Sequence, residues 1–528
     1  MRCSSNSARV RSGCRSFSPK GLDSTDDNAR SAPERPPGRR WRRRWLLATV
    51  LITWGATGYY HATKPVPPGT SVTSTPVNVD AGDVRFLYDL NVVDGRGRRV
   101  VQQQIFDTVF GIIDRARDFV VLDFFLFNND GGAASSPAEP PYRPLSSQLA
   151  DRLIARKRTL PGLKILFITD PINELYGATH ASAIDRLRSV GIDVVVTNLE
   201  PLRDSNAVYS GLYRLFVGWW ARDSAGQGWL PNPLDEGTEP VTLRAWLNLL
   251  NFKANHRKII AADDGAGGLV GIVSSANPHD ASSAHSNVAL EIHGPLVADL
   301  LESEMAVAKF SGWRQSWRPP SLYASNAGGP LTAQLLTEGA IGQAVIEAIN
   351  GTVPGDTIDI AMFYLSERDV VETLIAAAQR GIAIRLILDP NKDSFGRVRD
   401  GVPNRPAATE MVRQSNGMIQ VRWYRTHGEQ FHTKLVFVKR ANRAWLMLGS
   451  ANLTRRNIGN YNLEADIVVT AGRDSSLALE VQRYFDMLWQ NDPLTLREYT
   501  SDFPTYEDQS FGRYWRYRLM EATGLSTF

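Results

Sequence analysis

A short pattern that occurs twice constrains the fold of this 528-residue chain more than any other feature. His256-Arg257-Lys258 is followed by Ser275-Ala276-Asn277, and His432-Thr433-Lys434 is followed by Ser450-Ala451-Asn452. The separation between the His and the Asn is 21 residues in the first copy and 20 in the second. This matched spacing predicts an internal duplication, with two similar halves whose histidines meet in one active site.

Apolar runs that are typical of buried strands recur in both halves, with helical periodicity between them. They lie at residues 119–127, 163–169 and 191–197 in the first half and at 357–364 and 382–388 in the second. One run in each half ends in an Asp-Pro pair, at Asp170 and Asp389, which repeats the duplication independently of the histidines. The order of strand, helix and strand predicts α/β layers.

The first 82 residues differ in character from the rest of the chain. Residues 1–44 are rich in Arg, Ser and Pro, and we expect a disordered basic cytoplasmic tail. Residues 45–61 are apolar and follow an arginine run, which favours a signal anchor, with a cleaved signal peptide as the alternative. Residues 62–82 have the composition of a Pro/Ser/Thr linker. Residues 83–325 and 326–528 then form the two halves.

The charge is unevenly distributed along the chain. Residues 1–64 hold 13 Lys/Arg against four Asp/Glu, and the remainder has a net charge of −5. The folded part therefore lacks the overall basic excess of a nucleic-acid binder.

Both interpretations of the apolar segment at residues 45–61 place the folded body outside the cytoplasm. We expect it at the periplasmic or extracytoplasmic side of a bacterial-type inner membrane, or secreted.

The first half carries about forty extra residues before its motif, within residues 198–252. This insertion is rich in aromatic residues, namely Tyr209, Tyr213, Phe216, Trp219, Trp220, Trp229, Trp246 and Phe252. Such residues pack against a neighbouring lobe, or they form an amphipathic lip that touches lipid, because Trp and Tyr suit the membrane interface. Both interpretations stay open at this point.

The residue types of the repeated pattern suit chemistry on a phosphate diester. On a strand, residues i and i+2 project to one face, so each half directs a His and a Lys at the same spot. Lys258 and Lys434 would neutralise the non-bridging oxygens, while one of His256 and His432 attacks phosphorus and the other protonates the leaving oxygen. The lysines supply the positive charge, so no metal or cofactor is required.

Other polar residues near the motifs are expected to support this site. Hydroxyl and amide groups of the two Ser-Ala-Asn segments can donate hydrogen bonds to the phosphate; they belong to Ser275, Asn277, Ser450 and Asn452. A carboxylate behind each imidazole would fix its tautomer and raise its basicity, and Glu291 and Glu464 are the candidates. His427 is a candidate for the pocket lining, whereas His279 and His285 are expected to be ordinary loop histidines.

These residues resemble the signature of the phospholipase D superfamily, H-x-K-x4-D followed by G/S-S-x-N, present twice in a fused pseudo-dimer. The first copy matches fully, with Asp263 at the acidic position, but the second has Lys439 there. The resemblance covers about residues 83–490. It implies two fused phospholipase D-like α/β/α sandwich halves with mixed sheets, related by a pseudo-two-fold axis, with the active site at their interface and a covalent phosphohistidine.

The complete first motif motivates an assignment of the two histidines. We expect His256 to be the nucleophile and His432 the general acid, with Asp263 in the catalytic set. The predicted activity is that of a phospholipase D-like phosphodiesterase or phosphatidyltransferase on glycerophospholipids, which hydrolyses phospholipid or forms cardiolipin-type products. The expected partners are a phospholipid substrate and a membrane, without obligatory nucleic acid, and the expected state is a monomer.

Two other functions stay open. The first is an exported nuclease, which requires a basic cleft. Its candidate lining residues are Arg380, Arg385, Arg397, Arg399, Arg405, Arg455 and Arg456. The second is a scaffold that binds anionic lipid without turnover, and the replacement at Lys439 is its support.

Overall fold

The computed structural model describes residues 38–128, 142–221, 224–233, 239–314, 317, 328–394, 397–492 and 496–526. The chain divides into two units, Met1–Ile52 and Thr53–Phe528. Helix α1 (Gly38–Thr63) begins in the first unit and ends in the second. Most of the predicted disordered tail, residues 1–37, lies outside the described residues, and residues 38–44 belong to α1.

The apolar segment at residues 45–61 lies within α1. Among the helices of the described ranges, none has the combination of length and apolar character that a membrane crossing needs. The transmembrane helix expected from the sequence is therefore not supported by this structure.

The first half is built on an eight-stranded mixed sheet with the order β3-β2-β9-β8-β7-β4-β5-β6. Its strands are β2 (Val84–Val93), β3 (Arg99–Gln102), β4 (Phe119–Phe124), β5 (Lys164–Thr169), β6 (Asp193–Val196), β7 (Lys258–Asp263), β8 (Leu269–Ser274) and β9 (Asn287–His293). β4, β5 and β6 pair in parallel and the other neighbours are antiparallel. The central strands are apolar without alternation because both faces of the sheet are covered.

The second half repeats this arrangement in a nine-stranded sheet, β1-β10-β18-β17-β16-β11-β12-β15-β19. Its strands are β1 (Val77–Val79), β10 (Leu331–Thr337), β11 (Thr357–Met362), β12 (Ala383–Leu388), β15 (Ile419–Tyr424), β16 (Lys434–Lys439), β17 (Arg443–Gly449), β18 (Ala465–Gly472) and β19 (Thr500–Asp502). A small hairpin of β13 (Asp393–Ser394) and β14 (Arg397–Val398) stands apart. The duplication and the two mixed-sheet α/β halves are thus confirmed.

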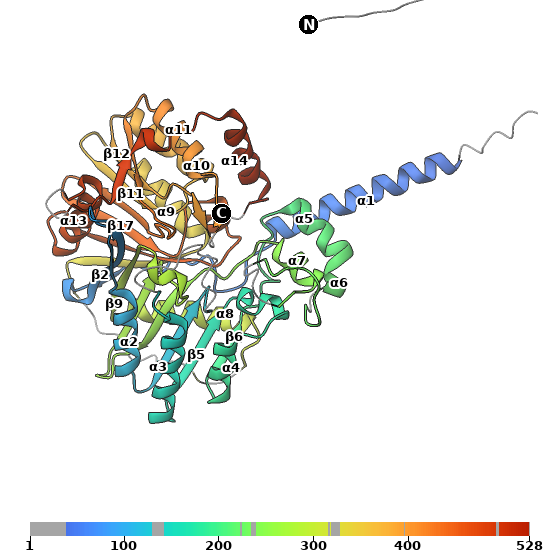
Figure 1. Ribbon diagram of the computed structural model, residues 1–528, viewed down its shortest axis with the longest axis horizontal. Coiled ribbons are helices and arrows are strands. Elements are labelled where there is room, and N and C mark those ends of the chain that lie inside the picture. Colours follow the sequence, from blue (N-terminus) through green and yellow to red (C-terminus); the bar gives the residue numbers. More distant parts are fainter. Residues whose placement is uncertain are drawn as a thin grey trace, which may run out of the picture. The chain divides into compact units, whose positions relative to one another are not determined.

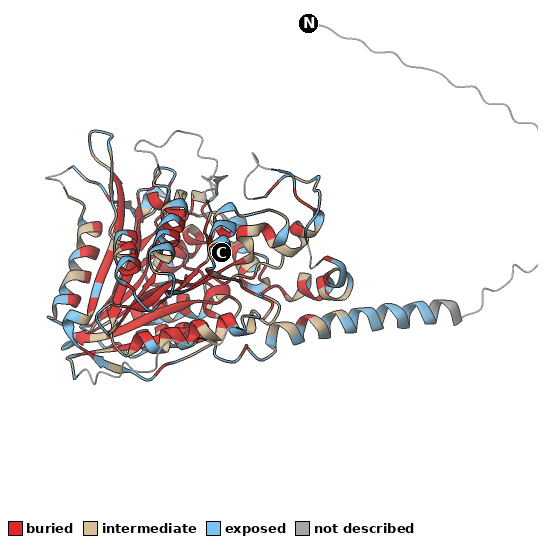
Figure 2. Ribbon diagram, turned by 90° about the horizontal axis from the view of Figure 1, so that it is seen from below, coloured by how far each residue is buried: buried red, intermediate tan, exposed pale blue. Residues whose placement is uncertain are grey.

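Helices cover the outer face of each sheet, and the inner faces share one core (Figure 1). The outer helices are α2 (Ile105–Arg115), α3 (Leu145–Thr159) and α4 (Ser182–Ser189) in the first half, and α9 (Gly339–Asn350), α10 (Arg368–Gln379) and α11 (Asn404–Gln414) in the second. α8 (Leu296–Phe310) and α13 (Ser476–Gln490) contribute to the shared core. Figure 2 shows the buried residues following the strands and the inner sides of these helices. Burial of both sheets in one core holds the halves in a fixed relation.

The segment predicted as a free linker, residues 62–82, is docked on the second half. β1 pairs antiparallel with β10 at the sheet edge, and Val79 is buried. Upstream of β1, the backbone N–H of Val72 donates to Thr337 Oγ1 at 2.7 Å. The Pro, Ser and Thr content concealed this edge strand, because an edge strand needs only a few backbone hydrogen bonds and tolerates proline nearby.

Candidate active site

The repeated pattern places a His and a Lys at the start of a central strand in each sheet. His256 lies two residues before Lys258, the first residue of β7, and His432 lies two residues before Lys434, the first residue of β16. Both histidines are at most 9 % exposed, and the two lysines are fully buried. β7 and β16 occupy the same position in their sheets, so the four side chains come from corresponding strand ends.

His256 is held by the second half of the chain. Its Nδ1 lies 2.9 Å from Oε1 and 3.0 Å from Oε2 of Glu464, and its backbone N–H donates to the Leu463 carbonyl at 2.9 Å. The buried Glu464 carboxylate also accepts from Ser450 Oγ at 2.5 Å and from the amide of Asn457. This arrangement fixes the proton on Nδ1 of His256 and leaves Nε2 as the reactive nitrogen.

His432 is held by the first half, through neutral groups. Its Nδ1 lies 2.9 Å from the carbonyl oxygen of Ser275 and 3.2 Å from Oδ1 of Asn287. Asn287 Oδ1 also accepts from Ser275 Oγ at 3.2 Å. Each imidazole is therefore oriented by the opposite half, but only His256 has a carboxylate behind it.

Asn287 and Glu464 occupy equivalent positions in the two sheets. Val288 directly follows Asn287, and Ala465 directly follows Glu464. The backbone N–H of Ser275 donates to the Val288 carbonyl at 2.9 Å, and that of Ser450 donates to the Ala465 carbonyl at 3.1 Å. Val288 and Ala465 donate their own N–H groups to the hydroxyls of Ser275 and Ser450, at 3.0 Å in both halves. The same backbone site thus carries an amide in one half and a carboxylate in the other.

Glu291, the other carboxylate candidate, stands behind neither imidazole. It pairs with Arg85 at 2.7 Å and lies 3.4 Å from the ring of His293. The prediction failed because it matched one Glu with another, whereas the loop after Asn277 is two residues shorter than the loop after Asn452. It also assumed that each half supports its own histidine.

The lysines and two phenylalanines repeat the same contacts in both halves. Lys258 Nζ donates to the His256 carbonyl at 2.5 Å, and Lys434 Nζ donates to the His432 carbonyl at 3.0 Å. Each ammonium lies 5.4 Å from the ring centre of a Phe, Phe125 or Phe363, and that ring lies 4.9 or 5.0 Å from the imidazole. The sequence reading missed both phenylalanines, although each lies six residues after the first residue of its strand, β4 or β11.

The site buries the two lysines together with the carboxylates of Glu464 and Asp466. Burial lowers the pKa of Lys258 to about 7. It also lowers the pKa of Lys434 well below its usual range, with Lys258 adding to the effect. The pKa of both histidines is lowered by burial and by the two lysines, while burial raises the pKa of Glu464 to about 8. A bound anion would restore the charged form of the lysines, so the site is matched to a phosphate diester.

The serines of the two Ser-Ala-Asn segments have hydrogen-bond partners that the sequence did not predict. Ser275 and Ser450 were expected to bind substrate, but their hydroxyls are bonded to Asn287 and Glu464 and so orient the supports of the histidines. Asn277 accepts from the backbone N–H of Leu126 at 3.2 Å, and the buried Oδ1 of Asn452 has no hydrogen-bond partner among the described residues.

Asp263, predicted as catalytic, lies at the far end of β7 from Lys258. Its carboxylate accepts from the backbone N–H groups of Arg117, Asp118 and Phe119 at 2.8 to 2.9 Å. It therefore organises the turn that enters β4 and is distant from the phosphate site.

Lys439 occupies the matching place at the end of β16, where it contacts Gln482 and lies 3.6 Å from Asp359. The replacement of the motif Asp in the second half alters a support at the far edge of the sheet and leaves the catalytic end unchanged.

Two other histidines were misjudged from the sequence. His427 lies in an exposed loop beside Glu429, with ring and carboxylate 3.7 Å apart, and none of its contacts in the described residues joins it to the catalytic set. His285, expected to be an ordinary loop histidine, is 5.7 Å from the His432 ring, and burial lowers its pKa to about 3. His285 is thus a neutral wall of the site.

A buried ion cluster connects the first motif to the support of its histidine. Arg257, between His256 and Lys258, is fully buried and pairs with Glu304 at 2.8 Å and with Glu338 at 2.6 Å. The backbone N–H of Glu464 donates to Glu338 Oε1 at 3.2 Å, and the backbone N–H of Glu338 donates to the Glu464 carbonyl at 3.3 Å. The cluster therefore ties the position of the Glu464 backbone to the motif strand of the other half.

Comparisons with known proteins agree with this geometry. Residues 345–489 match the family model for the cardiolipin synthase, phospholipase D-like domain. Among curated proteins, no sequence matches this chain significantly.

One solved structure shares the fold of this chain, and another is similar to a third of it. The crystal structure of phosphatidylserine synthase from Haemophilus influenzae Rd KW20 superposes with a TM-score of 0.51 at 11 % identity, covering 85 % of this chain and 96 % of that one. Nuc from Salmonella typhimurium, a phospholipase D family member, covers 33 % of this chain and 97 % of its own, with 19 % identity and a TM-score of 0.25. The likeness to the synthase shows that the two-half fold is shared.

Proposed function

Since the chain carries a domain of the phospholipase D superfamily and repeats its fold, we propose that it acts on the phosphodiester of glycerophospholipids through a covalent phosphohistidine. The observation that carries the proposal is the mutual support of the two histidines, each oriented by the opposite half next to two buried lysines. The matching family model, a cardiolipin synthase domain, and the similar structure of a phosphatidylserine synthase both favour phosphatidyl chemistry.

His256 is the proposed nucleophile because of Glu464. A carboxylate behind Nδ1 stabilises the positive charge that develops on the ring as Nε2 bonds to phosphorus. His432 rests on an amide and a carbonyl, which stabilise its imidazolium less, so it gives up a proton more readily. The sequence led to the same assignment because the first motif is complete, with Asp263 at its acidic position. In the structure the assignment depends on Glu464 instead, because Asp263 lies at the far end of β7.

In the first step, His256 Nε2 attacks phosphorus and the bond to the head-group oxygen breaks. Protonated His432 donates its Nε2 proton to the departing oxygen, which leaves as an alcohol. Lys258 and Lys434 neutralise the non-bridging oxygens as negative charge builds up on them, with the amides of Asn277 and Asn452 as further donors. The phosphate charge raises the pKa of His432, which favours the protonated form that this step requires.

In the second step, neutral His432 accepts a proton from water or from a lipid alcohol. The oxygen attacks phosphorus, and the bond to His256 Nε2 breaks. Water yields phosphatidic acid, and an alcohol such as phosphatidylglycerol yields a cardiolipin-type product. Both protonation states are regenerated, so the cycle needs no group beyond these side chains.

Both other functions lose part of their support. Of the basic residues proposed for a nuclease cleft, Arg385 pairs with Asp359 and Asp486 near the start of β12, whereas the site lies at its other end. The case for an inactive scaffold rested on Lys439, which lies far from the histidines. Membrane association on the extracytoplasmic side remains our proposal for the location of the body.

Incubation of the purified full chain with phosphatidylglycerol, phosphatidylcholine and single-stranded DNA tests the proposal. We expect release of phosphatidic acid or formation of a cardiolipin-type lipid, measured by mass spectrometry. A His256→Ala/His432→Ala double variant serves as the control for contaminating activity. Cleavage of DNA with no turnover of either lipid would refute the lipid assignment and favour the nuclease.

A further inference from the structure

An apolar stripe runs along one face of the insertion of the first half. The stripe lies on α5 (Ala207–Leu212), the π-turn that follows it (Tyr213–Val217) and α6 (Gly218–Ala221). Its members are spaced by three or four residues and are 40 % to 76 % exposed: Val208, Leu212, Phe216 and Trp219. This spacing puts them on one helical face. They have no counterpart in the second half, whose motif follows its Asp-Pro pair after only 43 residues.

The opposite face of the same helices is fixed to the body. Tyr209 Oη donates to the Leu247 carbonyl at 2.6 Å, and Tyr213 Oη bonds to Asn248, both on α7 (Leu243–Leu249). Trp220 and Trp229 are also exposed beside the stripe. The tyrosine hydroxyls are thus bonded within the insertion, Trp246 packs against a small buried cluster, and Arg456 lies 5.1 Å from the ring centre of Phe252. Of the two interpretations given from the sequence, packing accounts for these four aromatic residues, whereas Phe216, Trp219, Trp220 and Trp229 remain exposed.

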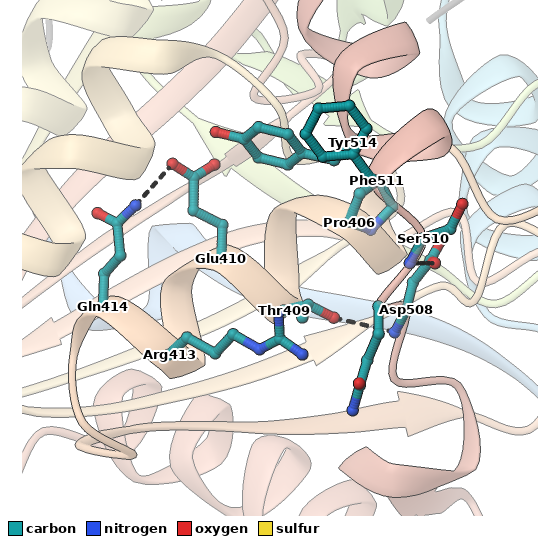
Figure 3. Close-up of a pocket in the computed structure, with 10 residues that line it drawn as sticks. Pro406, Thr409, Glu410, Arg413, Gln414, Asp508, Ser510, Phe511 and Tyr514 are labelled. Atoms are coloured by element: carbon teal, nitrogen blue, oxygen red, sulfur yellow. Dashed lines mark hydrogen bonds between the residues drawn. The ribbon is translucent and has the colours of Figure 1, made fainter.

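A second stripe of the same kind lies on the C-terminal helix α14 (Phe511–Thr523). Phe511, Trp515 and Leu519 follow one another at four-residue intervals and are 54 % to 78 % exposed. The helix is held from its other side by buried Tyr517 and Glu521. Figure 3 shows the hollow of about 300 Å³ between α11 and the start of α14, lined by Phe511 and Tyr514.

The end of α14 lies against the start of α5 (Figure 1). A Cβ atom on Gly524 would lie 2.0 Å from the Ser205 carbonyl oxygen, so the two backbones are in direct contact. Arg455, at the start of α12 (Arg455–Ile458), joins both: its Nη1 donates to the same Ser205 carbonyl at 3.1 Å, and its backbone N–H donates to Glu521 at 2.8 Å. The helices that carry the two stripes are thus joined at their ends.

The character of the surrounding residues selects a lipid as the occupant. The end of α1 joins the first stripe, because Trp54 Nε1 donates to the Val208 carbonyl at 2.9 Å. The chain has no charged residue from Trp45 to Tyr60. Residues 205–221 contain no carboxylate, and the single one of α14 is buried. Trp and Phe beside Arg, without exposed carboxylates on the same helices, are the pattern of an interfacial helix.

We propose that the stripes of α5–α6 and α14 together form a docking surface that inserts into the headgroup region of a phospholipid bilayer. The inference rests on the proposed function, since a phospholipid substrate must be reached in a bilayer. It assigns the aromatic insertion a partner, and it adds the C-terminal helix to the same surface.

The docking surface lies next to the catalytic set through α12. On one side of this short helix, Arg455 contacts Ser205 and Glu521 of the docking surface; on the other, Asn457 donates to the Glu464 carboxylate. A bilayer bound at the stripes would therefore lie beside the half-site that holds His256. Substrate would enter from the side on which the body rests.

Flotation of the full chain with phosphatidylcholine vesicles that contain phosphatidylglycerol tests the docking surface. Phe216→Ser/Trp219→Ser and Trp515→Ser/Leu519→Ser should each lower the vesicle-bound to free ratio about tenfold, because each removes two apolar side chains from the bilayer. Val353→Ser/Met418→Ser is the matched control, since these residues are similarly exposed elsewhere. α1 is present in every protein, so its contribution cancels.

The activity of each variant on a soluble bis(4-nitrophenyl) phosphate diester shows that the catalytic site is intact, and we expect it to stay within about twofold. Binding ratios within about twofold of the unmodified chain in both stripe variants would overturn the docking surface, whatever the enzyme acts on. Loss of a dimer in the variants with unchanged flotation would also overturn it, in favour of a second copy as the occupant.

The result is separable from the proposed function. Stripe-dependent flotation without turnover of detergent-solubilised lipid would refute the function and leave the docking surface standing.

Discussion

The two halves of the active site support their histidines with different chemistry from the same backbone position. In the second half, Glu464 places a carboxylate behind His256, and in the first half Asn287 places an amide behind His432. A nucleophile gains from a partner that stabilises positive charge on the ring, whereas a proton donor gains from a partner that does not. Under the proposed mechanism, the duplicated fold keeps its geometry and divides two roles between its copies by one side-chain difference.

Removal of either imidazole should have the largest effect on catalysis and tests which histidine is the nucleophile. His256→Ala and His432→Ala should each lower kcat by about 10³-fold or more, since one removes the nucleophile and the other the proton donor. With a 4-nitrophenyl ester, which needs no proton donor, His432→Ala should still accumulate phosphoenzyme, detectable by intact-mass measurement. Phosphoenzyme in His256→Ala and none in His432→Ala would reverse the assignment.

Exchange of the two groups that support the histidines, Glu464 and Asn287, tests whether the carboxylate and the amide have different effects. Glu464→Gln should lower kcat about 10²-fold, because Nδ1 of His256 loses the carboxylate that stabilises its charged form. Asn287→Asp, the reciprocal change, should lower kcat about tenfold on poor leaving groups, because it raises the pKa of His432 and makes the imidazolium a weaker donor. Stopped-flow rates on esters of graded leaving-group pKa measure both effects. Equal losses in both variants on all esters would remove the distinction between the supports.

The pH dependence of anion binding probes the lysines that the two halves share. Lys258 has a pKa of about 7 in the empty site, and a bound anion raises it. Above about pH 7, sulfate binding should therefore weaken by up to tenfold per pH unit through this group, because each anion then brings a proton to the amine. Isothermal calorimetry in buffers of different ionisation enthalpy measures that uptake. In Lys258→Arg the slope should vanish, since the guanidinium stays charged; a slope that persists would assign it to another group.

The smallest effect on catalysis is expected at the far ends of the motif strands. Asp263→Asn removes a carboxylate that accepts from four backbone N–H groups and should lower the free energy of unfolding by about 2 kcal/mol without changing kcat. Lys439→Gln, at the equivalent place in the other half, should change stability by less than about 0.5 kcal/mol. Urea unfolding and kcat on a soluble diester measure the pair. A loss of kcat in properly folded Asp263→Asn would return that residue to the catalytic set.

The sequence was sufficient for the fold and for the centre of the site. The duplicated spacing identified both histidines, both lysines and both asparagines, because these residues lie at fixed positions on repeated strands. It could not identify Asn287, whose role appears only when the halves pack together, since spacing within one half carries no information about contacts with the other. Glu464 was found as a residue, but its partner proved to be the histidine of the opposite half.

Other differences have local physical causes. Asp263 belongs to the signature pattern, yet six residues of extended strand separate it from the catalytic end, and the pattern does not distinguish a structural from a chemical residue. The linker was mistaken for a tether because a three-residue edge strand leaves almost no periodic signal. The sequence could not predict the two stripes of the docking surface, because only the structure shows which aromatic side chains are exposed to solvent.

The exchange of supports between the halves has a consequence for biosynthesis. A chain that has completed only its first half possesses His256 but not the carboxylate that orients it, and the isolated second half possesses His432 without Asn287 or the Ser275 carbonyl. Neither fragment can assemble a competent imidazole by itself. An enzyme that attacks the lipids of its own cell would thus stay inert on the ribosome and during any passage in an unfolded state, and would switch on only when the last core contact closes.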